Sequence, residues 1–164
     1  MNMDIPQEKL GPWGGNKGIA WDDGRLLGRI KQIDVHEGNG VIHAIDCQYE
    51  SNNNDCNSSS SVLSSSKHGG EGASIIHRID LDKDKCSPEY LVGISGFHGP
   101  VDGNRCVDQV VRSISFYTDQ GKHGPFGLEI GTSFHSPVCT NAKVVGFHGT
   151  SGEYLDAIGV HVQY

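Results

Sequence analysis

The chain has 164 residues, which is enough for one domain with a hydrophobic core and too few for two ordinary domains. Its 23 glycines, few aromatic residues and many Val and Ile residues favour short strands joined by tight turns, so the composition predicts a single all-β domain. A formal net charge of −7 argues against the basic surface that nucleic acids or an anionic membrane require, and no apolar run approaches the ~20 residues that span a bilayer.

Residues 1–10 come first and form a polar, acidic N-terminal extension. They lack the basic start and the apolar middle of a secretory signal. We therefore expect a soluble protein with a cytoplasmic or nucleocytoplasmic location.

Three glycine turns then recur along the chain. They lie at residues 13–18, 67–72 and 122–127, and Gly14, Gly69 and Gly124 follow one another at a constant spacing of 55 residues. Each turn is followed by two segments that are typical of half-buried strands, at residues 33–36 and 42–47, 95–99 and 111–116, and 146–149 and 155–160. Units of about 55 residues are too small to close a core alone. They are therefore predicted to pack as a pseudo-threefold arrangement of small antiparallel sheets.

Two inserts interrupt this regularity. Residues 51–66 are a polar, Ser- and Asn-rich segment without an apolar period, and residues 100–107 lengthen the turn of the middle unit. Both are predicted to be solvated loops without chemistry of their own.

The five cysteines are Cys47, Cys56, Cys86, Cys106 and Cys139. An odd number without a Cys-x-x-Cys pair fits neither a complete disulfide framework nor a structural zinc site. Free thiols are expected, with a bridge between Cys56 and Cys86 as the alternative in an oxidising compartment.

Both ends of the sequence resemble the jacalin-related lectins. Residues 11–16 read Gly-Pro-Trp-Gly-Gly-Asn, and residues 146–159 contain Gly-Phe-His-Gly and then Ser-Gly-Glu-Tyr-Leu-Asp-Ala-Ile-Gly. The segments 94–96 and 122–127 also look like that family. The resemblance covers residues 11–164 apart from the two inserts. It implies a lectin domain with the fold of a β-prism, which has three four-stranded antiparallel sheets and agrees with the repeat.

The resemblance also implies a sugar site built from two loops. In the family, a Gly-x-x-x-Asp loop offers its aspartate and successive main-chain groups to one edge of a sugar, and a Gly-Gly turn near the N-terminus adds one amide. Carried onto this sequence, the carbohydrate-binding residues are Gly14, Gly15, Gly152, Glu153, Tyr154, Leu155 and Asp156. Gly15 is the expected donor from the N-terminal turn. Gly152 is expected to need either a positive φ or the absence of a side chain.

The alternative for this loop is an ordinary hairpin in which Asp156 caps its own turn. Lys17 stands where the family usually has glycine, which is a departure that affects the shape of the N-terminal turn. Phe97 and His98 lie in a segment that resembles the family's secondary recognition loop. They are expected either to touch a second sugar or to pack within the chain.

Comparing the three units predicts one site per chain. Asp156 corresponds to His43 in the first unit and to Arg112 in the second, and neither is a carboxylate. Asn39 also replaces Gly152 in the first unit. The chain runs on uncleaved into Gly11, which in this family favours mannose or glucose over galactose. The expected partners are mannose- or glucose-containing glycans or glycoproteins, bound weakly by a homodimer or higher homo-oligomer that gains affinity through avidity.

Other functional classes fit the sequence less well. A glycosidase needs two carboxyl groups that face each other across the scissile bond, and Glu153 beside Asp156 is the only local pair. His36, His98 and His148 are interpreted as a recurring turn position rather than as metal ligands, because they belong to separate units. We therefore expect no enzyme, metal or cofactor, although an interaction module with a vestigial sugar loop remains open. The resemblance implies a plant-type lectin, a class often linked to stress or defence.

Overall fold

A computed structural model describes residues 6–24, 28–51, 62–84, 86–101, 108–137 and 141–164. Within these ranges the secondary structure consists of thirteen β-strands and their connections, without a helix. The described residues accordingly contain no helix that could cross a membrane.

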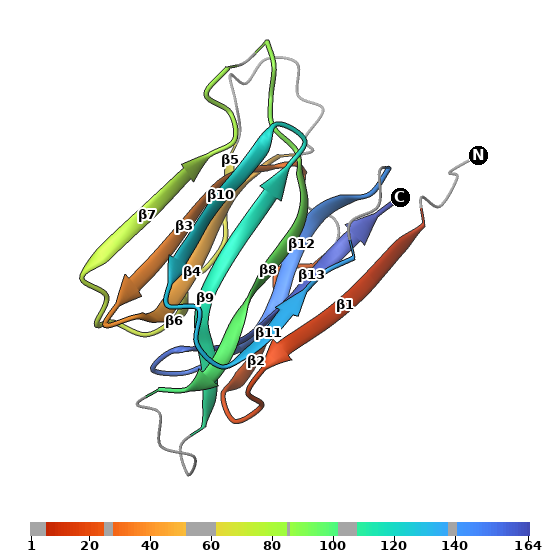
Figure 1. The fold of residues 1–164 in the computed structure, drawn as a ribbon. Coiled ribbons are helices and arrows are strands. Elements are labelled where there is room, and N and C mark those ends of the chain that lie inside the picture. The colour runs from red at the N-terminus through yellow and green to blue at the C-terminus, as the bar shows by residue number, and fades with distance from the viewer. Residues whose placement is uncertain (1–5, 25–27, 52–61, 85, 102–107, 138–140) are drawn as a thin grey trace.

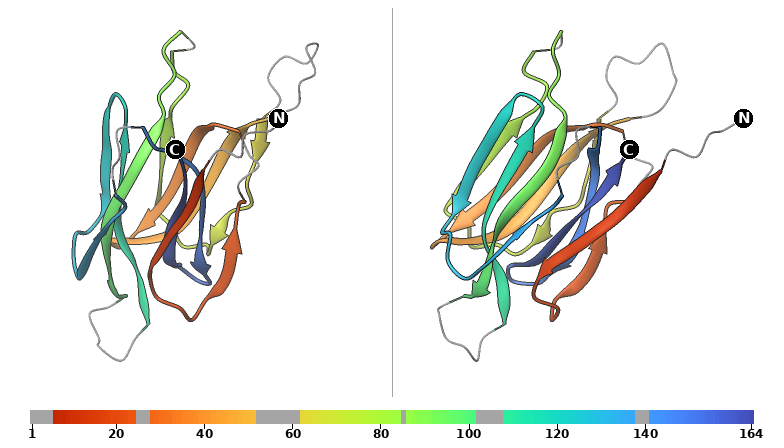
Figure 2. Two further views of the ribbon diagram at one scale, coloured as in Figure 1. Left: turned by 90° about the vertical axis from the view of Figure 1, so that its right-hand side faces the viewer. Right: turned by 45° about the vertical axis from the view of Figure 1, so that its right-hand side comes forward.

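The strands form three antiparallel sheets around a common core (Figures 1 and 2). The first sheet has the order β1 (Gln7–Gly14), β13 (Leu155–Gln163), β12 (Lys143–Ser151) and β2 (Ile19–Asp22). The second has the order β10 (Gly121–Gly127), β9 (Gln109–Thr118), β8 (Leu91–Pro100) and β11 (Thr132–His135). The third has the order β5 (Val62–Ser64), β4 (Val41–Glu50), β3 (Ile30–Gly38) and β7 (Ile75–Asp80), and β6 (His68–Gly69) also pairs with β4.

The predicted all-β prism with three sheets is confirmed, with one difference in the third sheet. There β5 and β6 pair with separate stretches of β4, so two short strands share one outer position. Residues 62–64 therefore form a strand inside a segment that was predicted to be a loop. In the first sheet, β1 begins at Gln7, four residues before the predicted start of the domain at Gly11.

The threefold repeat is present, but the spacing of 55 residues misplaces the third turn. The equivalent pairs across the two strands are Gly14 with Ala157, Gly69 with Ala44, and Gly127 with Ser113. Gly127, rather than Gly124, is thus the counterpart of Gly14. The physical reason is a bulge that shifts the register between His123 and Phe126 in β10, as one does between Leu10 and Trp13 in β1.

Aromatic pairs close each of the three seams between the sheets. Trp13 of β1 stacks on Phe134 of β11, Trp21 of β2 stacks on His68 of β6, and Phe126 of β10 packs on His77 of β7. The ring centroids are 5.7, 3.8 and 4.6 Å apart. All six residues lie on outer strands, so each sheet is tied to its neighbours by its edges.

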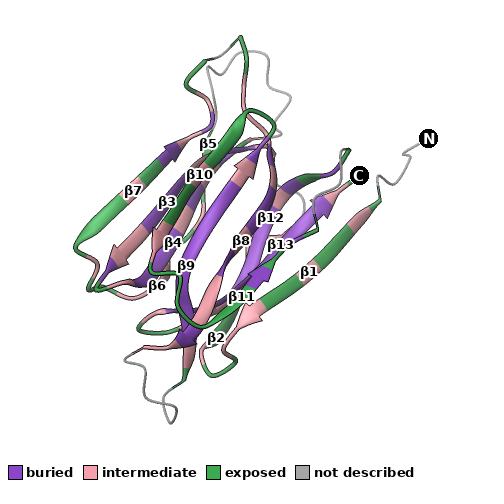
Figure 3. Cartoon of the chain, viewed as in Figure 1, coloured by how far each residue is buried: buried purple, intermediate pink, exposed green. Residues whose placement is uncertain are grey.

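The core lies inside the three sheets and is filled mainly by Ile, Val, Leu and Phe side chains. Phe116 of β9 meets Phe147 of β12 edge to face, with centroids 6.3 Å apart. The central strands are the most buried (Figure 3), and in β13 every residue from 155 to 162 is buried. Asp156 therefore begins its strand within a buried environment.

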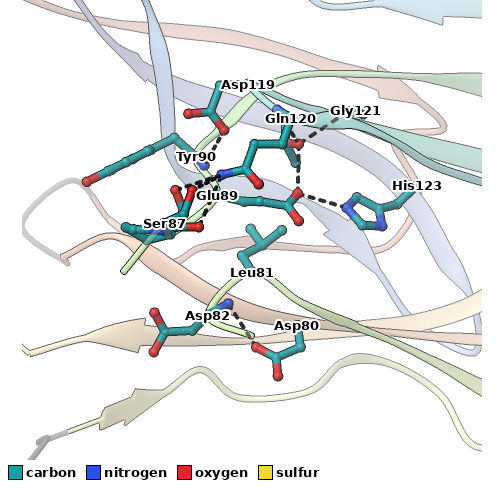
Figure 4. A network of polar contacts seen from close by, with 12 residues as sticks. Asp80, Leu81, Asp82, Ser87, Glu89, Tyr90, Asp119, Gln120, Gly121 and His123 are labelled. Atoms are coloured by element: carbon teal, nitrogen blue, oxygen red, sulfur yellow. Dashed lines mark hydrogen bonds and ion pairs between the residues drawn. The ribbon is translucent and has the colours of Figure 1, made fainter. Parts of the chain in front are cut away.

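A polar network holds the end of the prism at which β9 and β10 are joined (Figure 4). Glu89 accepts hydrogen bonds from Thr118 at 2.7 Å and contacts His123 at 3.0 Å. Gln120 donates to the backbone carbonyl of Ser87 at 3.1 Å, and the Tyr90 amide donates to Asp119 at 3.0 Å. This network fixes the connection between β7 and β8 on the β9–β10 hairpin.

Two of the five cysteines fall within the described residues. Cys47 is buried, Cys86 is exposed, and both are free thiols. Cys56, Cys106 and Cys139 lie outside the described residues, as do most of the two predicted inserts.

Candidate functional site

Three connections meet at the end of the prism where β1 turns into β2 and β12 turns into β13 (Figure 1). They enclose a pocket of about 320 Å³. Its lining combines the N-terminal turn, the loop before β13 and the two ends of the β8–β9 connection, through Lys17, Gly18, Val101, Asp108, Val110, Gly152, Glu153, Tyr154 and Asp156. The sequence predicted the loop before β13, whereas the contribution of Val101 and Asp108 was missed because they border an insert without a motif.

The N-terminal turn is held to the loop before β13 by backbone contacts. The Gly15 amide donates to the Asp156 carbonyl at 2.9 Å, and the Thr150 hydroxyl donates to the Gly15 carbonyl at 2.8 Å. A side chain at Gly15 would lie 2.2 Å from the Gln109 carbonyl, so glycine permits this close approach to β9. Because its amide is engaged inside the protein, Gly15 supports the turn, which differs from its predicted role as a donor to a ligand.

Gly18 is the residue of this turn that lies against the Asp156 side chain. A Cβ at Gly18 would stand 2.1 Å from Asp156 Oδ2 and 2.6 Å from the Ser151 carbonyl oxygen. Only a residue without a side chain fits there. The sequence did not single out Gly18, although it ends the first glycine turn.

Asp156 is a carboxylate without a hydrogen-bond donor among the described residues. Only 9% of the residue is exposed, yet no described backbone or side-chain group donates to its oxygens. Burial, followed by the negative charge of Asp108, raises the pKa of the Asp156 carboxyl to about 6. The alternative in which Asp156 caps its own turn finds no support in these contacts.

The loop before β13 presents Gly152 and Glu153 to solvent. The Gly152 amide donates to the Tyr154 carbonyl at 3.0 Å, which closes the loop on itself. A Cβ on Gly152 would meet no other atom of the protein within 4 Å, and Gly152 does not have a positive φ. The expectation that the chain itself requires glycine at this position is therefore wrong.

The predicted secondary contacts occupy a strand rather than a loop. Phe97 and His98 are half-buried residues of β8, and neither lines the pocket. His98 Nδ1 lies 2.9 Å from Gln109 Oε1, and its ring stacks on Phe134 with centroids 6.3 Å apart. His98 thus packs behind the start of β9, which supports the side of the pocket that carries Asp108.

The counterparts of Asp156 in the other two units are those that the sequence predicted. His43 and Arg112 are buried residues on the strands that pair with the other two glycine turns. The loop of Gly152 and Tyr154 separates the Asp156 pocket from a second pocket of about 500 Å³ that His43 lines. Tyr154 contacts the His43 ring, with centroids 5.0 Å apart.

The three histidines interpreted as a recurring turn position do not share a position. His36, His98 and His148 lie within strands, opposite Ala44, Val111 and Gly159 respectively. In the repeat these are different register positions, because Gly96 and Phe97, rather than His98, occupy the places equivalent to Val35 and His36. The described residues contain no group of three or more His, Cys, Asp or Glu side chains that could hold a metal ion.

Comparison with known sequences identifies one family model, described as "Jacalin-like lectin domain", which matches residues 10–161. An agglutinin of Castanea crenata is 47% identical over 164 residues, covering 100% of this chain and 49% of the agglutinin. The jacalin-related lectin Calsepa of Calystegia sepium is 34% identical over 160 residues and covers 97% of both chains. A mannose/glucose-specific lectin of Parkia pendula is 36% identical over 157 residues, covering 94% of this chain and 31% of that lectin. The chain thus spans about half the length of the agglutinin and about a third of the Parkia lectin.

Solved structures give the same result. Frutapin, a lectin from Artocarpus incisa, has a TM-score of 0.79 and 35% sequence identity, with 100% of both chains covered. A mannose-specific jacalin-related lectin from Morus nigra in complex with mannose has a TM-score of 0.79 and 34% identity, covering 99% of this chain and 97% of the other.

Proposed function

The chain belongs to the jacalin-like lectin family, and on that premise we propose that it binds mannose- or glucose-type glycans in the pocket of Asp156. A lectin family, rather than a family of enzymes, agrees with the prediction made from the sequence. The proposal on sugar class is supported by the relatives, since one is named a mannose/glucose-specific lectin and one structure contains mannose.

The observation that carries the proposal is the unsatisfied carboxylate of Asp156. A buried polar group without a partner is costly, so a chain that keeps one leaves room for a ligand to complete its hydrogen bonds. Sugar hydroxyls are suitable donors, and an ionised carboxylate accepts from two of them at once. Gly18 clears the space beside one carboxylate oxygen, and Gly152 leaves the rim without a side chain.

The structure shifts the proposed contacts within the predicted set. We propose that Asp156 and the main chain of residues 152–155 bind the sugar, and that Gly18 borders it on the side of the N-terminal turn. Gly14 and Gly15 hold that turn in place, Gly14 with a φ of 128° and Gly15 through its bond to the Asp156 carbonyl. We propose one such site per chain, because His43 and Arg112 carry no carboxylate.

Calorimetric titration with methyl α-mannoside tests this proposal. One site of this size is expected to bind with a dissociation constant of about 1 mM, with one sugar per chain. Asp156→Asn keeps the volume of the side chain and removes its charge, and it is expected to weaken binding about 100-fold, because charge-assisted hydrogen bonds are lost. Unchanged binding by Asp156→Asn would contradict the proposed site.

Parallel titrations separate the remaining alternatives. Tighter binding of methyl α-galactoside than of methyl α-mannoside would assign the chain to the galactose-binding type. No binding of either sugar would favour an interaction module with a vestigial site. Since a millimolar site needs repetition to be useful, we also propose a homodimer or higher homo-oligomer, which light scattering would detect as a multiple of 17.7 kDa.

A further inference from the structure

An ion pair lies on the rim of the Asp156 pocket. Lys17 Nζ is 2.8 Å from Asp108 Oδ1, and both residues line the pocket. Lys17 comes from the turn between β1 and β2, whereas Asp108 directly precedes β9. The pair therefore joins the first sheet to the second at the mouth of the pocket.

The charges around the pocket are unbalanced. Of its described lining residues, Asp108, Glu153 and Asp156 are acids, and Lys17 is the only base. At neutral pH the lining thus carries two more negative charges than positive ones. The ammonium group of Lys17 already faces a carboxylate of the protein, so its charge is directed at Asp108 rather than at the pocket.

We propose that the Lys17–Asp108 pair determines the charge specificity of this site, so that the site takes neutral hexoses and rejects the corresponding uronic acids. The inference rests on the proposed sugar-binding function and names the ligand class more narrowly. Asp108 prevents Lys17 from acting as a receptor for a carboxylate, and the net negative lining repels an acidic sugar. A lysine freed from Asp108 would be a receptor of the kind that proteins use for carboxylates.

Two ligands of nearly the same shape isolate the effect of charge. The methyl glycoside of mannuronic acid carries a carboxylate at C6, and the methyl glycoside of mannuronamide carries a neutral amide in its place. The ratio of their dissociation constants is the readout, because a general loss of affinity cancels in the ratio. The unmodified protein is expected to bind the amide about ten-fold more tightly than the acid at low salt.

Two variants should move this ratio in opposite directions. Asp108→Asn removes one negative charge and frees Lys17, so the preference for the amide is expected to fall about five-fold. Lys17→Met removes the only base of the lining while keeping a similar stem, so the preference is expected to rise. Raising the salt concentration from about 10 mM to about 500 mM should weaken the preference in the unmodified protein.

Glu8→Gln provides the matched control. It also removes one negative charge from an exposed residue, but Glu8 lies near the start of β1, the strand whose other end leads into the pocket. This variant should leave the ratio unchanged. An equal shift in Glu8→Gln and Asp108→Asn, or none in Asp108→Asn, would overturn the inference.

The remaining outcomes are also decisive. If Asp108→Asn binds neither sugar, the pair supports the shape of the pocket and does not select charge, which overturns the inference while leaving the proposed function intact. If the unmodified protein binds no methyl α-mannoside, both proposals fail together. Mannoside binding with equal affinity for the acid and the amide rejects only the charge specificity.

Discussion

The corners that carry Asp156 and Arg112 occupy equivalent places in the prism and use their polar side chains in opposite ways. Arg112 donates to the carbonyl of Gly40 at 3.0 Å and to that of Pro100 at 2.6 Å, so its hydrogen bonds connect parts of the chain. Asp156 is equally enclosed but has no donor among the described residues. The same backbone position can therefore serve either the fold or a ligand, and the side chain decides which.

His43 is intermediate between these two corners. Its Nε2 lies 3.0 Å from the Gly38 carbonyl oxygen, whereas its buried Nδ1 has no partner among the described residues. Gly72 borders the His43 ring as Gly18 borders Asp156, because a Cβ at Gly72 would come within 3.2 Å of Nδ1. The three corners thus share their glycine architecture and differ in how many hydrogen bonds the chain itself satisfies.

The largest expected effect comes from filling the space beside Asp156. In Gly18→Ala the new methyl group would overlap Asp156 Oδ2, so the carboxylate must move, and mannoside affinity is expected to fall about 100-fold. Gly152→Ala is the matched control for folding, because its methyl group meets no protein atom. Its free energy of unfolding should stay within about 0.5 kcal/mol of the unmodified value. Full sugar affinity in Gly18→Ala would show that this glycine does not shape the site.

A second prediction tests the opposite use of Arg112. Arg112→Ala leaves the carbonyl groups of Gly40 and Pro100 without their donor, so the free energy of unfolding is expected to fall by about 2 kcal/mol. Asp156→Asn breaks no described hydrogen bond and removes a buried charge, so it should not lower stability at pH 7. Urea denaturation of both variants measures the difference. Equal destabilisation would remove the distinction between a corner that serves the fold and one that serves a ligand.

The smallest expected effect is on pH dependence. Because the pKa of Asp156 is about 6, its carboxylate is mostly ionised at pH 7 and mostly protonated at pH 5. Sugar affinity should therefore fall about ten-fold as the pH drops from 7 to 5, since the protonated group accepts fewer hydrogen bonds. A calorimetric pH series would contradict this if binding fell only below pH 4, where an ordinary aspartate titrates.

Stability should change in the opposite sense over the same pH range. The pKa of Asp156 in the folded state is raised above the model value of 3.8, so the folded protein binds more protons than the unfolded chain between these values. The contribution of Asp156 to stability is therefore present in acid and is lost as the pH rises through about 6. Comparing Asp156→Asn with the unmodified protein in this range isolates that contribution from those of other groups.

The sequence predicted the features that repeat or that are local to one loop. The positions of Asp156, His43 and Arg112 on equivalent strands followed from matching apolar patterns, because side-chain alternation ties register to burial. The third glycine turn was misassigned because the bulge before Phe126 changes the count of residues without changing the apolar pattern. The histidines were misaligned for a similar reason, since a bulge also shifts β8 against β9 between Phe97 and His98.

Other parts of the site depend on contacts between distant segments. Lys17 and Asp108 meet although 91 residues separate them, and no local pattern marks either as the partner of the other. The choice between Gly15 and Gly18 required the hydrogen bond of the Gly15 amide, which is a tertiary contact. Sequence spacing identified the loops, whereas the structure shows which groups of the loops remain available to a ligand.

Pairing of β1 with β13 brings residues 7–14 beside residues 155–163, and the Tyr164 amide also donates to the Pro6 carbonyl at 3.0 Å. During translation, β1 and β2 leave the ribosome long before the strands with which they pair. Such distant pairing is slow to form and exposes strand edges in the meantime. The sheet that carries Asp156 is therefore completed last, so capture of nascent chains on a mannose resin would mark the moment at which synthesis passes β13.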